Sequence, residues 1–392
     1  MQALPILTFA NKQSKNILGG IMFLKTAYLS AILLGTVLFP QNAASKNAFE
    51  NQLDFFQSNF ISSQKVSTNI QVENQICRFS WQSGTYERVR VGFSEEQHSG
   101  VVESVRFTPN GRFLITAGLD GDVRIWDIEE RRLDRILSTD SAIFTSAVSA
   151  DGRFLATGNR SGSIYIWDLS NRQLVNRRQI HEGVVTVVAF SPDSTTLASA
   201  GEDRKINLWD SSSGALQETL ISEQWVESMA FMSDGQTLLE GGIGRYVGVW
   251  NWRNRRLIRN IDESYPTLIN AIAASQKSSL FAFSADNSVP TATSSASDRN
   301  TVRVMDLSNN QERFRFSGHT DYVETLSFSP DDTQILSGGL DKTVRIWSLS
   351  EDRQIQEISL ESAILSAEFD RSCSRFAVAT RSGSIFIYRS NE

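Results

Sequence analysis

The 392-residue chain is poor in the residues on which metal binding and nucleophilic catalysis most often depend. It contains two cysteines and three histidines. Two cysteines cannot supply a four-thiolate zinc site or a dense disulfide framework. The sequence also has no Gly-x4-Gly-Lys-Ser/Thr phosphate loop. Four-cysteine zinc proteins, disulfide-rich secreted scaffolds and nucleotide-hydrolysing enzymes of the P-loop type are therefore excluded.

The chain also lacks an excess of positive charge. Its 38 Lys and Arg residues are outnumbered by 44 Asp and Glu residues, which gives a formal net charge of -6. Nucleic-acid phosphates require a basic face, so we expect no nucleic acid among the partners. With 40% hydrophobic and 21% charged residues, the composition is typical of a soluble globular protein.

A hydrophobic stretch near the N-terminus has lysines before it and small residues after it. Residues 27–39 are nearly all apolar, and no charged side chain occurs from Thr26 to Ser45. This order is typical of a secretory signal peptide, and the apolar run is shorter than the roughly 20 residues that span a bilayer. We predict a signal segment over residues 1–45, cleaved after Ser45, with Met22 as an alternative start. The periplasm, a lumen or the extracellular space would then hold the protein without a stable membrane span. An uncleaved membrane anchor and a hydrophobic N-terminus with no targeting role are the alternatives.

A repeat of about forty residues organises the chain after residue 85. An aromatic residue followed by Asp, or a near variant of this pair, recurs at intervals of 41 or 42 residues with one interval of 55. Alternating β-branched stretches and short turn sequences occur between the copies, which indicates four short strands per repeat and an all-β fold. The copies are Trp126-Asp127, Trp167-Asp168, Trp209-Asp210, Trp250-Asn251, Met305-Asp306, Trp347-Ser348 and Tyr388-Arg389.

These features resemble the WD-repeat β-propeller family over residues 85–392. The Gly318-His319 opening, the Ser-Pro-Asp turns and the closing Trp-Asp pairs are signatures of that family. The resemblance implies a seven-bladed β-propeller that displays loops to other proteins. It implies no catalytic residue and no cofactor.

The resemblance also implies a buried tetrad in each complete repeat: a His before the first strand, a Ser or Thr on the second, an Asp in the next turn and the Trp of the third. Such a polar chain is stable only when every member is paired. The three tetrads use all the histidines, so none remains for a catalytic triad or a metal site. They are His98, Thr116, Asp120 and Trp126; His181, Ser199, Asp203 and Trp209; and His319, Ser337, Asp341 and Trp347.

The seventh repeat has a third strand, residues 384–388, but no fourth strand after it. An unassigned strand at residues 86–91 precedes the first repeat, and we predict that it completes the last blade and leaves no interior edge open. Cys77 and Cys373 are expected on the bottom face of this blade. In an oxidising compartment they would pair as a disulfide, and two unrelated thiols are the alternative. Residues 46–84 fit no blade and are expected to form an irregular extension.

A propeller displays on its top face the loops that join the fourth strand of one blade to the first strand of the next, and the second strand to the third. Aromatic, Arg and acidic residues at these positions indicate a docking surface for one or more proteins, with a basic surface on the partner. The long fifth interval places an insertion, residues 287–297, on the same face as a lid, a partner contact or a disordered loop. The predicted docking residues are Asp140, Arg160, Glu182, Glu202, Glu223, Trp225, Tyr265, Tyr322, Leu340 and Arg381.

Two classes of function remain open at this point. The first is a protein-interaction scaffold without covalent chemistry. The second is a ligand- or calcium-binding propeller that hydrolyses a substrate with carboxylates on the top face or in the central channel. Glu240 is the candidate carboxylate for the second class, because it stands on the second strand of blade four where other repeats have Ser or Thr.

Overall fold

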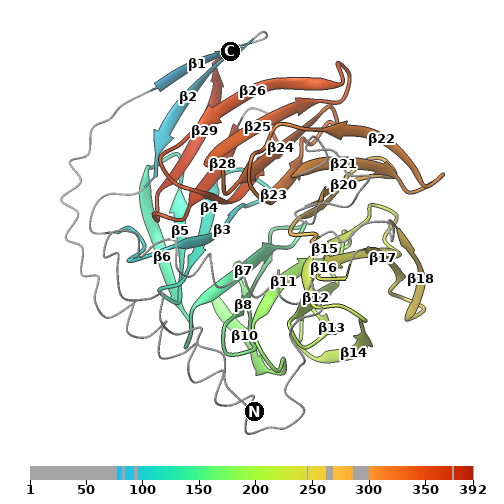
Figure 1. Ribbon diagram of the computed structural model, residues 1–392. Helices are drawn as coiled ribbons and strands as arrows, with labels where there is room; N and C mark the ends of the chain where they lie inside the picture. Colours follow the sequence, from blue (N-terminus) through green and yellow to red (C-terminus); the bar gives the residue numbers. More distant parts are fainter. Residues whose placement is uncertain are drawn as a thin grey trace, which may run out of the picture. The chain divides into compact units, whose positions relative to one another are not determined.

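The computed structural model describes residues 77–81, 84–91, 96–244, 246–261, 268–285, 300–372 and 375–391. All of them belong to one compact unit, Ile70–Glu392. Within these ranges 29 strands form seven antiparallel sheets. Figure 1 shows the sheets arranged as blades around a common centre, so the predicted all-β, seven-bladed propeller is confirmed. No helix suited by length and hydrophobicity to crossing a membrane occurs in the described ranges.

Six of the blades are built from four consecutive strands each. Blades one to three comprise β3 (Val102–Phe107), β4 (Phe113–Gly118), β5 (Asp122–Asp127) and β6 (Arg132–Ser138); β7 (Ile143–Val148), β8 (Phe154–Asn159), β9 (Ser163–Asp168) and β10 (Gln173–Gln179); and β11 (Val185–Phe190), β12 (Thr196–Gly201), β13 (Lys205–Asp210) and β14 (Leu216–Ile221). Blades four to six comprise β15 (Val226–Phe231), β16 (Thr237–Gly242), β17 (Val247–Asn251) and β18 (Arg256–Ile261); β19 (Ile272–Ala274), β20 (Leu280–Ala285), β21 (Thr301–Asp306) and β22 (Gln311–Phe316); and β23 (Val323–Phe328), β24 (Gln334–Gly339), β25 (Thr343–Ser348) and β26 (Arg353–Ser359).

Burial falls from the middle strands of a blade to its outer strand. In blade two, every residue of β8 and β9 is buried, whereas most residues of β10 are exposed. The middle strands lie between neighbouring blades, so both of their faces are apolar. One core cluster joins Ile115 and Val123 of blade one to Leu155 and Trp167 of blade two. The polar outer strands protect the open sheet edges from pairing with other chains.

Side-chain hydroxyls connect the inner strands of neighbouring blades around the ring. A Ser or Thr on one inner strand accepts a hydrogen bond from a backbone N–H of the next, which satisfies an amide that the blade's own sheet does not use. The bonds run from Val105 N to Ser366 Oγ (3.2 Å), Val188 N to Thr145 Oγ1 (3.3 Å), Ile272 N to Ser228 Oγ (2.9 Å) and Ala367 N to Thr325 Oγ1 (3.0 Å).

Blade seven is completed by a strand from the other end of the chain. It contains β27 (Ile364–Phe369), β28 (Arg375–Thr380) and β29 (Ile385–Asn391), and β2 (Gly84–Arg90) pairs with β29. Figure 1 shows the blue strand β2 beside the red strand β29. The closure predicted from the repeat boundaries is therefore confirmed.

A further strand, β1 (Cys77–Trp81), pairs with β2 and gives blade seven a fifth strand. It lies within residues 46–84, for which the sequence predicts an irregular extension. Residues 77–81 carry no turn signal or repeat copy that marks a strand. The strand β1 forms there because the open edge of β2 offers it a pairing partner. Cys373 and the side chain of Cys77 lie outside the described residues, so the disulfide stays a prediction.

The His-containing tetrads form continuous hydrogen-bonded chains inside blades one, three and six. In blade one, the Trp126 indole N–H donates to Thr116 Oγ1 at 2.9 Å, and the Thr116 hydroxyl lies 2.8 Å from His98 Nε2. His98 Nδ1 lies 2.9 Å from Asp120 Oδ1. With the hydroxyl donating to Nε2 and Nδ1–H donating to the carboxylate, every member is satisfied. The other two tetrads repeat these contacts at 2.8–3.0 Å: His181, Ser199, Asp203 and Trp209; and His319, Ser337, Asp341 and Trp347.

The aspartates of these tetrads are stabilised in their ionised form. Burial alone raises the pKa of Asp341, but the hydrogen bond and charge of His319, the Thr320 N–H and the Thr343 hydroxyl outweigh burial and lower the pKa to about 2. At Asp120, burial is likewise outweighed by the interactions with His98 and by the charge of Arg124, which lower its pKa to about 2. Each tetrad therefore contains an aspartate whose pKa is lowered in the folded protein, so its ionised form favours the fold.

We expect Asp341→Asn to lower the free energy of unfolding at pH 7, and the difference from wild type to shrink by pH 3. The folded carboxyl has a lower pKa than its ordinary 3.8, so its contribution is complete above pH 4 and disappears as the pH falls toward 2. The titratable part is about 2 kcal/mol at neutral pH. Urea unfolding at both pH values measures it, with the exposed Asp352→Asn as the control. An equal loss at pH 7 and pH 3 would contradict the assignment.

Candidate functional site

The backbone brings the two series of predicted top-face loops together. In six blades, the N–H of the residue that follows the second strand donates to the carbonyl of the residue before the first strand. This contact places a residue of the loop between the second and third strands beside a residue of the loop that leads into the first strand. The pairs are Leu119 and Val101 (3.0 Å), Arg160 and Ala142 (2.9 Å), Glu202 and Val184 (3.3 Å), Ile243 and Trp225 (3.2 Å), Leu340 and Tyr322 (2.8 Å), and Arg381 and Ala363 (2.9 Å).

Two large aromatic residues occupy this ring of equivalent positions. Trp225 and Tyr322 are partly buried, and the corresponding residues of the other four blades are Val or Ala. Trp225 precedes blade four and Tyr322 precedes blade six. A bulky ring held at a fixed backbone position loses little conformational entropy on binding, which suits it to anchor a partner.

The remaining predicted docking residues divide by exposure. Glu182, Glu202 and Glu223 are exposed, and Arg160, Leu340 and Arg381 are partly buried. Glu182 accepts a hydrogen bond from Lys205 Nζ at 3.1 Å while its side chain stays 78% exposed. Tyr265 and the predicted insertion at 287–297 lie outside the described residues.

Asp140 has a structural role that the sequence did not indicate. Blade two lacks the tetrad histidine, and there the Tyr165 hydroxyl donates to Asp140 Oδ1 at 2.8 Å while Asn159 Nδ2 donates to the same oxygen at 3.0 Å. Arg177 also pairs with Asp140. Burial first, and then the hydrogen bond to Asp140, raises the pKa of Tyr165. Blade two has thus replaced the His-centred chain with a Tyr–Asp–Asn network at its top edge.

Glu240, the candidate catalytic carboxylate of the sequence analysis, is buried inside blade four. It stands at the tetrad position of Thr116, opposite Gly248, and is 1% exposed. Burial raises the pKa of Glu240, and the nearby Trp250, Ser222 and Gln224 only partly oppose that shift. A Cβ on Gly248 would lie 2.6 Å from a Glu240 carboxyl oxygen, so the missing side chain of residue 248 makes room for the larger acid.

Two charged residues at the ring closure were not among the sequence-based candidates. The carboxylate of Glu368, on β27, accepts the Phe107 backbone N–H at 2.8 Å, and Arg106, on β3, donates to the Ser146 carbonyl at 3.0 Å. Burial raises the pKa of Glu368, against the opposing charge of Arg106. These side chains connect blades seven, one and two. Their neighbours come from opposite ends of the sequence, so no local motif marks them.

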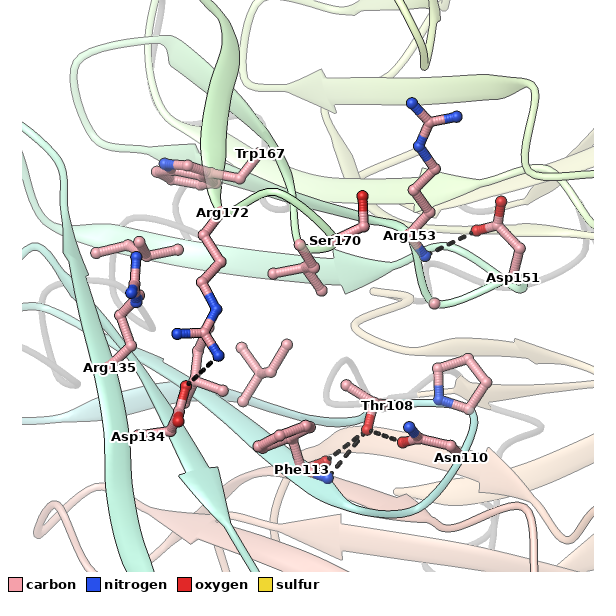
Figure 2. Close-up of a pocket in the computed structure, with 16 residues that line it drawn as sticks. Thr108, Asn110, Phe113, Asp134, Arg135, Asp151, Arg153, Trp167, Ser170 and Arg172 are labelled. Atoms are coloured by element: carbon pink, nitrogen blue, oxygen red, sulfur yellow. Dashed lines mark hydrogen bonds and ion pairs between the residues drawn. The ribbon is translucent and has the colours of Figure 1, made fainter.

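A groove of about 390 Å³ lies between blades one and two (Figure 2). Phe113, Leu137 and Trp167 contribute apolar side chains to it. Figure 2 shows Arg172 reaching across toward Asp134, to which it pairs at 3.6 Å. The turn residues 108–110 and 151–153, which follow the first strands, place this groove away from the top-face loops.

The groove does not assemble a set of convergent acids. Asp134 pairs with Arg172, and the Asp151 carboxylate accepts bonds from the Ser149 hydroxyl and the Arg153 N–H within its own turn. Within the part of the chain that the structure describes, no group of three or more His, Cys, Asp or Glu residues is arranged to hold a metal ion.

We expect Glu240→Gln to raise the free energy of unfolding at pH 7. The pKa of Glu240 is higher in the folded protein than in the unfolded chain, so this carboxyl favours the fold below its unfolded pKa and loses that contribution as the pH rises through the folded value. Gln has a similar shape and cannot ionise. Urea unfolding at pH 7 and pH 4 should show a gain for the variant at pH 7 that is absent at pH 4. A loss of stability at both values would show instead that the carboxyl is required for packing.

Comparison with known families agrees with the architecture. The family profile described as "WD domain, G-beta repeat" matches residues 91–127, 133–168, 172–210 and 310–348. Each of the last three matches begins at or next to an outer strand and ends with the third strand of the following blade. The sequence repeat is therefore offset by one strand from the structural blade, which is the arrangement that requires β2 to complete blade seven.

Curated relatives match about half of this chain. Protein groucho of Drosophila melanogaster is 30% identical over 193 residues, which is 47% of this chain and 25% of that protein. Transducin-like enhancer protein 2 of Mus musculus is 30% identical over 199 residues, 48% of this chain and 24% of that protein. A periodic tryptophan protein 2 homolog of Dictyostelium discoideum is 26% identical over 219 residues, 55% of this chain and 23% of that protein. The chain thus spans about a quarter of the length of these relatives. Together, the four matched repeats and the seven blades support the WD-repeat β-propeller family for this chain.

Proposed function

We propose that the protein is a non-enzymatic scaffold that binds partner polypeptides on its top face. Propellers of this family generally bind other proteins and are typically non-enzymatic. The observation that carries the proposal is the pair Trp225 and Tyr322, two aromatic residues fixed at equivalent positions by backbone hydrogen bonds to Ile243 and Leu340. Large amphipathic side chains of this kind carry most of the binding energy in protein interfaces.

Charge supports a partner with a basic surface. Exposed Glu182 and Glu202 stand on loops of blade three, and exposed Glu223 lies two residues before Trp225 on the loop that leads into blade four. Acidic residues around an aromatic anchor steer a basic partner to the surface and raise the association rate, an effect that salt screens. The closed ring holds these loops still, so binding needs no rearrangement of the scaffold and involves no covalent step.

We expect a Trp225→Ala/Tyr322→Ala double variant to lose the partner. The full chain, used as bait in the fraction where it resides, should capture a protein whose affinity for the variant is lower by about tenfold or more, because removal of an aromatic hot spot costs about 2 kcal/mol or more. Quantitative capture followed by titration of the identified partner measures this effect.

The matched control removes exposed apolar side chains that lie on outer strands. Ile221, on β14, is 65% exposed, and Ile258, on β18, is 50% exposed. An Ile221→Ala/Ile258→Ala variant should hold the partner as wild type does. If the control variant loses the partner and the aromatic variant keeps it, the docking surface is the rim of the blades and the proposal is wrong.

We further infer that residues 1–45 direct export of the protein. The support is the order of positive charge, apolar run and small residues in the sequence. The mature chain should begin at Lys46 and fractionate with exported proteins, and N-terminal sequencing of the purified protein measures this directly. An intact N-terminus on protein recovered from the interior of the cell would contradict export.

A further inference from the structure

A second cavity, of about 560 Å³, lies between blades six and seven beside the top-face loops. One wall is residues 359–362, where β26 leads into β27, and another is the loop between β28 and β29. Arg88 and Arg90 of β2 form the third wall. The cavity therefore depends on the closure of blade seven by β2, and no single repeat contains it.

The two arginines give the cavity a local positive charge. They are two residues apart on a strand, so their side chains share one face of β2. Within the described residues, the guanidinium of Arg90 bonds only to the Ser384 hydroxyl, at 3.2 Å, and its Nε is buried without a hydrogen-bond partner. The Arg88 guanidinium lies 5.0 Å from the centre of the Phe386 ring, which keeps it at the wall of the cavity.

Hydroxyl groups supply most of the other polar atoms of the cavity. Thr380 Oγ1 lies 3.0 Å from Ser382 Oγ, and Ser382 Oγ lies 3.4 Å from Ser384 Oγ. Ser362 Oγ accepts the Ser382 N–H at 3.1 Å. A hydroxyl hydrogen rotates to suit its neighbour, so this cluster can turn its donors toward an acceptor in the cavity. Guanidinium and hydroxyl donors without a buried carboxylate suit a ligand rich in acceptor oxygens.

The charge outside the cavity limits the kind of anion that fits. Glu361 at the cavity is exposed, and the glutamates of blades three and four add negative charge to the same face. A long polyanion such as a nucleic acid would meet all these acids, whereas one compact anionic group would meet the two arginines and one lining acid, Glu361. Leu360 and Phe386 line the cavity as well, and they suit the carbon atoms of the residue that carries the anion.

We propose that this cavity binds a phosphate- or sulfate-ester side chain of a partner polypeptide. The ester oxygens would accept hydrogen bonds from Arg90, Arg88 and the hydroxyls of the β28–β29 loop. The cavity would then select modified partners among those that the aromatic residues hold. This inference deepens the proposed docking function and rests on it, but its binding step can be measured on its own.

The test uses the purified full chain and short fluorescein-labelled peptides of neutral sequence. One peptide carries phosphoserine, one phosphotyrosine and one sulfotyrosine, and the matched peptides are unmodified; inorganic phosphate and sulfate serve as competitors. Fluorescence anisotropy should show binding of at least one modified peptide, and the tightest one identifies the ester. Arg90→Gln should weaken that binding by about tenfold or more, because it removes charge-assisted hydrogen bonds.

Two further variants separate loss of binding from loss of folding. Ser382→Glu adds a negative charge at an exposed position of the loop and should also abolish binding. Arg178→Gln, at an exposed arginine of β10, should bind as wild type does. The Trp225→Ala/Tyr322→Ala variant should keep the modified peptide, so failure of the docking proposal would be seen separately.

Equal binding of modified and unmodified peptides would overturn the inference. So would no binding of any modified peptide, or wild-type binding by both Arg90→Gln and Ser382→Glu. Binding of inorganic phosphate or sulfate that none of the modified peptides displaces would show a site for free anions and would equally overturn the assignment to a partner polypeptide.

Discussion

The pairing of β2 with β29 is the interaction on which the rest of the structure depends. Each blade covers the apolar face of the next, so an open ring would leave one face of blade one and one face of blade seven in water. By supplying the fourth strand of the last blade, β2 locks the two ends of the propeller together. The contacts of β27 with β3, including the Ser366 and Glu368 bonds to blade one, then complete the ring of inner strands.

Inside that ring, different blades fill the buried position beneath their top loops with different side chains. Three blades fill the space beneath the top loops with a His-centred polar chain in which each atom has a partner. Blade two fills it with Tyr165, Asp140 and Asn159, and blade four with the buried acid Glu240 opposite Gly248. The fold tolerates this variety because the backbone ladder is satisfied within each sheet. The position accepts groups of different size and polarity, and in blade four Gly248 makes room for the larger acid.

The fold was predictable from the sequence because its information is local and repeated. The forty-residue spacing, the strand patterns and the tetrad offsets each recur within one repeat, and the missing fourth strand of blade seven indicated the role of residues 86–91. The strand β1 was not predictable, since its pairing partner is an edge that exists only in the folded ring. The burial of Glu240 was not predictable for a related reason. Its position on a second strand gave its place in the sheet, while its orientation toward Trp250 depends on packing inside the blade.

The candidate sites also differ in whether local sequence information was enough to predict them. Trp225, Tyr322 and the glutamates could be assigned to the top face by counting from the repeat, because each belongs to a loop of fixed offset. The cavity of Arg88 and Arg90 could not, since its walls come from strand β2 and from loops near the opposite end of the chain. Arg106 and Glu368 are another such pair. Residues that meet across the closure have no common motif, and only the three-dimensional arrangement brings them together.

The closure also determines how the protein must fold. The contact between Val89 and Ile387 joins segments separated by almost the whole propeller, so the entropy of closing that loop is lost before the contact contributes any stabilisation. Linear repeat arrays can grow from any point by adding neighbours, but a ring of seven blades gains its seventh interface, between blades seven and one, only when it closes. Every blade can therefore begin to form as it is synthesised, whereas the complete propeller, and with it the cavity between blades six and seven, comes into existence only after the final strand is available.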